Sequence, residues 1–254
     1  MVTYAILFLV GLAFGSFFNV VAYRLPRQIS MVKLSSHCPH CEVHIPWKYK
    51  IPLVSFFWLK GKCHFCGNPI SWQYPLVESI TGVFTLVLLH RFGLSGEFLF
   101  YLIFGYGLIL ISVIDFREMI IPNSILVTML GLGIGVNFIF NVQDWTNAFW
   151  GMGIATLGLL AIGVIGKVIA NRDALGMGDV KLGSVAGFFL GGNMIIYAIF
   201  FSFFVAFLAI VLMLILSRLQ RRDSIPFGPF MAIAMVSFML WGNSLIQWYW
   251  GLFS

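Results

Sequence analysis

Long runs of apolar residues constrain this chain more than any other feature of its sequence. A helix needs about 20 residues to cross the hydrocarbon core of a bilayer. The apolar runs of helical length cover residues 2–22, 76–90, 97–114, 123–140, 146–169, 180–192, 194–217 and 229–250. Only 9% of the residues are charged, against about 25% in soluble domains. The sequence therefore predicts an all-α polytopic membrane protein of about eight transmembrane helices.

Two of these runs have unusual ends. The first lacks a basic stretch before it and a small-residue cleavage site after it, so we expect a retained span rather than a signal peptide. The sixth is short, and the turn Gly191-Gly192-Asn193 separates it from the seventh. We expect a partial span there, which is tolerated where its ends are buried in protein or reach water.

The basic residues predict the orientation of the spans. Segment 23–75 holds seven Lys and Arg against a single acid, Glu42, so the positive-inside rule makes it cytoplasmic and the N-terminus external. Alternating the spans then puts segments 115–122, 167–181 and 218–228 in the cytoplasm. Every basic residue except Arg91 falls on that side. The net charge of +6, which in a soluble protein would favour nucleic acid, is explained by these loops, and we expect no nucleic-acid partner.

Four cysteines in segment 23–75 form two Cys-x-x-Cys pairs, Cys38/Cys41 and Cys63/Cys66. Two such pairs at this separation are a typical zinc-site pattern, in which four sulfurs close a tetrahedral structural site. Two disulfides are the alternative, which a reducing cytoplasm disfavours. Neighbouring histidines are further candidate ligands: His37, His40, His44 and His64. The sequence thus divides into a first helix at 1–22, a small cytoplasmic zinc-binding domain at 23–75 and a multi-span domain at 76–254.

Ionisable residues in apolar runs are expensive and indicate function by default. Glu78 lies one turn into the second run. Two interpretations stay open for it: a carboxylate paired with a cation such as Arg24, or a ligand contact where the soluble domain meets the membrane.

Two aspartates stand at the predicted cytoplasmic ends of apolar runs. Asp115 ends the third run, and Asp179 begins the sixth within Gly176-Met177-Gly178-Asp179. A simple helix cap is one interpretation of Asp179. Two carboxylates at one depth also fit peptide hydrolysis, because close like charges separate their pKa values, so that one acts as base on water and the other as acid. Glycines at 183, 187 and 191 continue from Asp179 as a bare stripe suited to tight helix packing.

Several motifs, taken in order, resemble the bacterial type IV prepilin peptidases, which are aspartyl proteases of the GxGD class. They lie along nearly the whole chain: Gly15–Pro26, the two cysteine pairs, Ile51–Leu53, Tyr74–Glu78, Asp115–Pro122, Gly176–Leu182 and Ile225–Pro229. The resemblance implies that Asp115 and Asp179 are the catalytic pair. It implies cleavage of the basic leader of prepilins and pseudopilins after a glycine, at the cytoplasmic face of the inner membrane.

The resemblance also implies that the new N-terminal amine is methylated from S-adenosylmethionine. Asn19, Arg24 and Glu78 are the candidate residues for binding that cofactor. The expected partners are prepilin-like substrates and membrane lipid. The acids Glu118, Asp173 and Asp223 lie in cytoplasmic loops, where they either meet the basic leader or are merely solvated.

Two other classes of function are alternatives. An ion-coupled transporter would use Asp115 and Asp179 as cation sites, but both lie at the membrane edge rather than at its midplane. A membrane anchor that recruits a partner through the cysteine domain would leave both aspartate motifs without a role.

Overall fold

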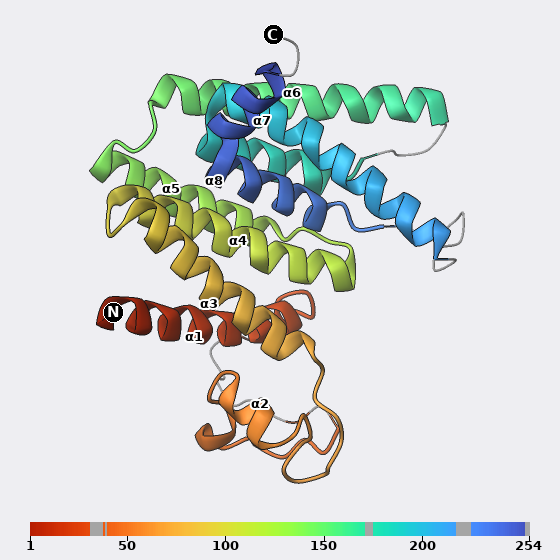
Figure 1. Cartoon of the computed structure of the whole chain (residues 1–254). Coiled ribbons are helices and arrows are strands. Elements are labelled where there is room, and N and C mark those ends of the chain that lie inside the picture. Colours follow the sequence, from red (N-terminus) through yellow and green to blue (C-terminus); the bar gives the residue numbers. More distant parts are fainter. Residues whose placement is uncertain (31–37, 39, 171–174, 217–224, 252–254) are drawn as a thin grey trace. The chain divides into compact units, whose positions relative to one another are not determined.

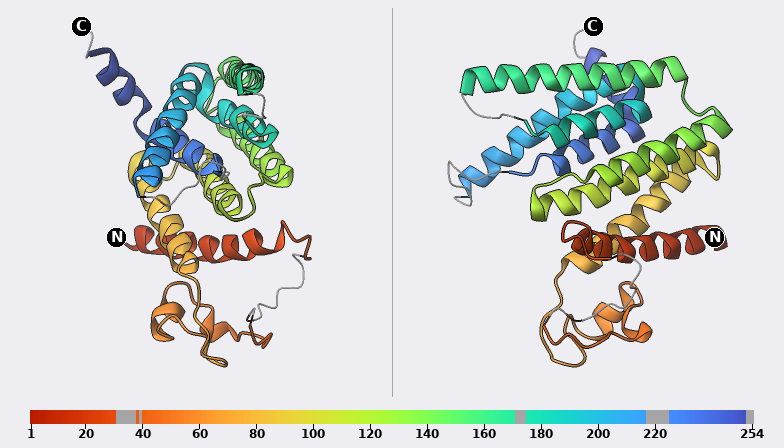
Figure 2. Two further views of the ribbon diagram at one scale, coloured as in Figure 1. Left: turned by 90° about the vertical axis from the view of Figure 1, so that its right-hand side faces the viewer. Right: turned by 180° about the vertical axis from the view of Figure 1, so that it is seen from behind.

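The computed structural model describes residues 1–30, 38, 40–170, 175–216 and 225–251, and every regular element in these ranges is helical. Seven of the described helices are long and apolar enough to cross a membrane. The chain divides into two compact units, Met1–Gly93 and Leu94–Ser254. Figures 1 and 2 show the helices of each unit. The prediction of an all-helical, multi-span protein is confirmed.

The first unit is a helical hairpin that carries the cysteine segment between its two arms. The arms are α1 (Val2–Arg24) and α3 (Gln73–Phe92), which lie side by side in Figure 1. The described part of the segment between them contains one 3-10 turn, η1 (Trp47–Tyr49), and one short helix, α2 (Val54–Trp58). A long connection with little regular structure thus begins and ends at the same end of the hairpin.

Small residues let the two arms approach closely. A Cβ atom added at Gly15 would lie 2.6 Å from the Cα atom of Glu78, and one added at Gly11 would lie 2.8 Å from the Cα atom of Gly82. Helices in lipid associate through such close backbone contact, because burying apolar surface there gains little. The hydroxyl group of Thr81 donates a hydrogen bond to the carbonyl of Val77 within α3, at 2.6 Å, so it needs no partner on α1.

The described residues of the second unit form five helices. They are α4 (Gly96–Glu118), α5 (Asn123–Phe140), α6 (Trp145–Ala170), α7 (Met177–Ile215) and α8 (Gly228–Gly251). The Ser95 hydroxyl caps α4 by accepting the N–H of Phe98 at 3.2 Å. Asp144 precedes α6, and hydrogen bonds from the Thr146 hydroxyl and the Asn147 N–H hold the pKa of its carboxyl below the usual value.

The long helix α7 is broken at Gly191, whose φ of 76° and ψ of 170° are not helical. The second half of α7 returns toward the end of the unit where the first half began. This is shown by the rings of Phe203 and Phe227, whose centroids are 4.9 Å apart, since Phe227 immediately precedes α8. The two halves, 177–190 and 192–215, correspond to the sixth and seventh runs of the sequence. Glycine is needed at the break because it adopts a positive φ without steric cost.

The glycine stripe of α7 packs against α6, as the sequence predicts. A Cβ atom at Gly187 would overlap the backbone of Gly151, and one at Gly183 would overlap the side chain of Leu159. Aromatic rings fill the opposite contact, where Phe104 of α4 stacks on Phe189 of α7 with ring centroids 4.6 Å apart. The first half of α7 is therefore packed closely on α6 and contacts α4 through these rings.

Many large apolar side chains face outward from the membrane helices. On α6 they include Trp150, Leu157, Val168 and Ile169, each at least 70% exposed. Water would disfavour such a surface, whereas lipid does not, because the hydrocarbon tails are as apolar as these side chains. The exposed apolar surface supports the assignment of this chain as a multi-pass membrane protein.

Candidate active site and metal centre

Asp115 lies in the last turn of α4 and is buried, with 5% of its surface exposed. Its Oδ2 atom accepts a hydrogen bond from the backbone N–H of Gly228, at a distance of 2.9 Å. The helix ends three residues later, at Glu118, because the next residue, Met119, takes a left-handed conformation. The carboxylate is thus fixed at the end of one helix by the first residue of another.

Gly228 has no room for a side chain. A Cβ atom at this position would lie 2.8 Å from Asp115 Oδ2 and 3.2 Å from Asp115 Cγ. The motif Ile225–Pro229 was visible in the sequence, but it did not identify Gly228 as a contact of Asp115. The signal was the Gly-Pro pair, since proline favours the first turn of a helix and glycine permits close approach.

Asp179 occupies the first turn of α7 and is half-buried. One of its carboxylate oxygens accepts the N–H of Gly176, the N-cap residue, at 3.2 Å. Gly176, not Asp179, is therefore the cap of α7, and Asp179 stands three residues later in the first turn. The Asp179 carboxylate can still accept further hydrogen bonds, because an ionised aspartate has about four acceptor sites.

The structure brings the last turn of α4, which carries Asp115, and the first turn of α7, which carries Asp179, to one end of the second unit. The loop after α4 contributes to this proximity, since a Cβ atom at Gly178 would lie 3.1 Å from the Cβ atom of Ile121. Lys181 of α7 also donates to the side-chain oxygen of Asn123 at 3.0 Å. Residues from the starts of α5, α7 and α8 thus surround the end of α4.

The four cysteines of the first unit form a compact cluster. Their sulfur atoms all lie within 4.8 Å of one another, and none takes part in a disulfide. Burial disfavours ionisation of Cys38, but backbone hydrogen bonds at Cys41 and His40 lower its pKa to about 6. A hydrogen bond at Val43 favours the Cys41 thiolate, yet burial and the nearby Cys38 raise the pKa of Cys41 to about 11. A divalent cation would favour all four thiolates together.

The candidate cofactor residues Asn19 and Glu78 lie on the helical hairpin and are buried. The Asn19 amide donates to the carbonyl of Tyr74 at 3.2 Å and accepts from the side chain of Gln73 at the same distance. Glu78 accepts the backbone N–H of Leu53 at 2.8 Å. Arg24, at the end of α1, donates to the carbonyl of Ser30 at 3.3 Å. Cofactor binding by these three residues stays a prediction.

Glu78 holds a strained turn in place. Leu53 has a φ of 59° and a ψ of −51°, and the N–H of Val54 donates to the carbonyl of Pro52 at 2.6 Å. This is the rare γ-turn with positive φ at its centre, which costs free energy unless its surroundings enforce it. The Glu78 carboxylate supplies such a contact. The motif Ile51–Leu53 therefore ties the cysteine segment to α3.

Comparison with known proteins divides the chain at a similar place. A model of the bacterial peptidase A24 N-terminal domain matches residues 9–92, and a model of the type IV leader peptidase family matches residues 102–217. A Bacillus subtilis protein named prepilin leader peptidase/N-methyltransferase is 34% identical, over 96% of this chain and 97% of its own length. This chain belongs to the type IV leader peptidase family.

Other members of the family match this leader peptidase over similar lengths. Proteins of the same name from Stutzerimonas stutzeri and Pseudomonas aeruginosa are 30% and 31% identical, over 94% and 95% of this chain and 91% of their own lengths. No solved structure matches the chain. The family membership that the sequence motifs indicate is thereby confirmed.

The structure also locates some of the histidines and loop acids that the sequence offered as further candidate site residues. The candidate metal cluster in the described part of the chain consists of cysteines alone. His64 stacks on Tyr49 with ring centroids 4.5 Å apart. Glu118 lies in the last turn of α4, close to Asp115 in sequence. His37, Asp173 and Asp223 lie outside the described residues.

Proposed function

We propose that this chain is a membrane aspartyl peptidase that removes the basic leader of type IV prepilins or pseudopilins and methylates the new N-terminus. The observation that carries the proposal is that the last turn of α4, with Asp115, and the first turn of α7, with Asp179, meet at one end of the second unit through Gly178 and Ile121. Family membership supports the activity, since the named relatives are prepilin leader peptidases and N-methyltransferases.

The proposed chemistry is general acid–base hydrolysis by the two aspartates. One carboxylate takes a proton from a water molecule, while the other, protonated, donates a hydrogen bond to the carbonyl of the scissile peptide. Mutual repulsion favours a single shared proton, which supplies an acid and a base at the same pH. The hydrogen bond from Gly228 keeps the Asp115 carboxylate from rotating away. The hydrolysis forms no covalent intermediate with the enzyme.

The proposed substrate fits the position of the aspartates on their helices. A prepilin has an apolar helix that enters the bilayer and a basic leader that stays outside it. Asp115 is in the last turn of α4 and Asp179 in the first turn of α7, so both carboxylates lie at helix ends rather than at mid-span. The positive-inside pattern assigns these ends to the cytoplasmic face of the inner membrane.

The proposed methyltransferase site lies in the first unit. S-adenosylmethionine supplies the methyl group when it is bound. Glu78 fits the ammonium group of this cofactor, or that of the new N-terminus, because Leu53 N–H uses only part of the hydrogen-bonding capacity of the carboxylate. The Asn19 amide already contacts Gln73 and Tyr74, which favours a positioning role for it.

We also propose that the cysteine cluster binds one zinc ion through Cys38, Cys41, Cys63 and Cys66. Four sulfur donors suit zinc and leave no open position, so the ion would be structural. A segment of about 50 residues has a small core, which a metal commonly stabilises.

A transporter receives no support from these observations. Both aspartates lie at helix ends, and the relatives that match most of the chain are named peptidases. A non-catalytic anchor would likewise leave the contact between Gly228 and Asp115 without a role.

Cleavage of a prepilin peptide by the purified protein tests the proposal. Asp115→Asn and Asp179→Asn should each lower the cleavage rate by several orders of magnitude, because asparagine cannot accept the proton of the water. Asp144→Asn is the matched control, since Asp144 caps α6 and belongs to neither site. Near-normal cleavage by either of the first two variants would exclude the pair as the catalytic residues.

A further inference from the structure

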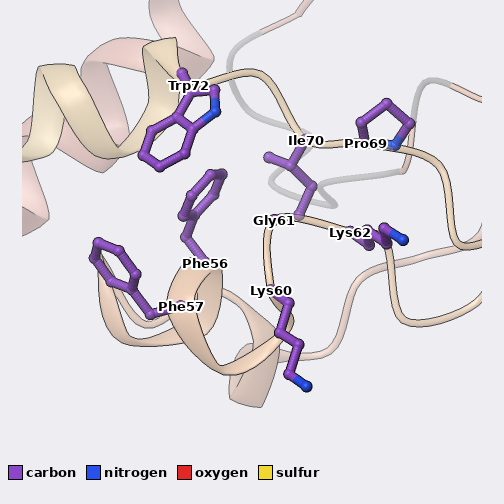
Figure 3. Close-up of a pocket in the computed structure, with 8 residues that line it drawn as sticks. All are labelled: Phe56, Phe57, Lys60, Gly61, Lys62, Pro69, Ile70 and Trp72. Carbon is purple, nitrogen blue, oxygen red and sulfur yellow. The ribbon is translucent and has the colours of Figure 1, made fainter.

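The first unit contains a groove that is separate from the aspartates and from the cysteine sulfurs. Its volume is about 390 Å³. Figure 3 shows its lining, which consists of Phe56, Phe57, Lys60, Gly61, Lys62, Pro69, Ile70 and Trp72. These residues come from α2, from the stretches on either side of the second cysteine pair, and from the position that precedes α3. We call this feature the aromatic groove.

The walls of the aromatic groove are fixed by the fold. Phe56 is buried, and its ring lies 4.9 Å from that of Trp72 between centroids. The backbone on the opposite side is closed by a hydrogen bond from the N–H of Ile70 to the carbonyl of Gly61, at 2.7 Å. Lys62 and Pro69 pair across the same turn. The groove is therefore present before any ligand binds.

The lining selects a ligand that is partly apolar and negatively charged. Phe57 is 64% exposed and Trp72 is 70% exposed, so both present large apolar surfaces outside the core. Lys60 and Lys62 stand beside them, and Figure 3 shows their ammonium ends extending outward, away from the rings. No acidic residue occurs between positions 43 and 77 to neutralise these cations.

The position of Trp72 places the groove at the surface of the membrane. Trp72 is the N-cap of α3, and the candidate membrane span begins at the next residue, Gln73. Tryptophan beside lysine is typical of the headgroup layer, where one part of the side chain is wet and the other apolar. Basic segments next to a span attract anionic lipids.

We propose that the aromatic groove binds one anionic phospholipid. The phosphate contacts Lys60 and Lys62, and the glycerol end of the acyl chains covers Phe57 and Trp72. Such a lipid would hold the cysteine segment against the membrane surface. The proposal is independent of the peptidase and methyltransferase assignments, because it uses none of their residues.

Native mass spectrometry of the full chain in detergent tests the proposal. The protein is titrated with phosphatidylglycerol or with phosphatidylcholine, and the affinity for the first bound lipid is measured. We expect tighter binding of phosphatidylglycerol, and about 30-fold weaker binding in Lys60→Gln/Lys62→Gln, since each of the two lysines near an anionic lipid contributes about 1 kcal/mol. The matched control is Lys48→Gln/Lys50→Gln, which removes two charges from the same segment outside the groove.

A second variant tests the apolar half of the groove. Phe57→Ala keeps both lysines and should still weaken lipid binding, and excess glycerol phosphate should not displace the lipid, because it lacks acyl chains. Thermal unfolding of each variant verifies that the first unit remains folded. Equal affinity for the two lipids would overturn the proposal. Equal loss in the groove and control double variants, or displacement by glycerol phosphate, would also overturn it.

Discussion

Replacing Gly228 by alanine tests how closely the start of α8 controls Asp115. The added Cβ atom would lie 2.8 Å from Asp115 Oδ2, whereas ordinary contacts begin at 3.4 Å. The carboxylate must therefore move by about 0.6 Å, and a misplacement of 1 Å in an active site costs about 100-fold in rate. We expect leader cleavage to fall roughly 10- to 100-fold. The backbone itself should tolerate alanine, because Gly228 does not have a positive φ.

The assay follows cleavage of a prepilin peptide by mass spectrometry, with methylation of a pre-cleaved peptide measured in parallel. Methylation should persist, since the candidate methyltransferase residues belong to the first unit. Gly153→Ala is the matched control, because a Cβ atom there meets nothing within 4 Å. Wild-type cleavage by Gly228→Ala would refute the reasoning, as would an equal loss in the control.

The remaining predictions concern the first unit. Purified protein should contain one zinc ion per chain by elemental analysis. Cys38→Ser or Cys63→Ser should lose the metal and loosen the segment between α1 and α3, because metal binding supplies folding free energy. Metal-free wild-type protein would contradict this prediction. Glu78→Gln should weaken methylation and leave cleavage largely intact, because the amide oxygen can still accept the N–H of Leu53 but the charge is lost. Normal methylation by Glu78→Gln would limit Glu78 to holding the turn at Leu53, and Glu78→Leu, which removes the acceptor too, should then impair the cysteine segment.

Some features of the site could be predicted because they depend on local pattern. Apolar runs specify helices in a membrane, since each helix satisfies its own backbone. Alternating the runs predicted that Asp115 and Asp179 share one side, and the structure brings the two helix ends that carry them together. Regular spacing of cysteines predicted a cluster, because each pair needs only a tight turn, and the four sulfurs indeed gather.

Other features depend on contacts between residues far apart in the chain. The hydrogen bond from Gly228 to Asp115 joins residues separated by 113 positions, and the sequence contained only an unassigned motif there. The contact of Glu78 with Leu53 likewise gives this carboxylate a backbone partner that the sequence did not indicate. The aromatic groove was not anticipated, because no periodic pattern links Phe57, Lys62 and Trp72.

The sequence by itself determined the number of apolar segments, the chemistry of the carboxylates and thiols, and the break at Gly191, because each depends on residue type or on neighbours within a few positions. Tertiary structure alone decided which backbone N–H fixes each carboxylate, and which side chains line the aromatic groove. The physical reason is that helix formation is driven by local hydrogen bonds in an apolar medium, whereas the orientation of a side chain at a helix end depends on the element that packs against it.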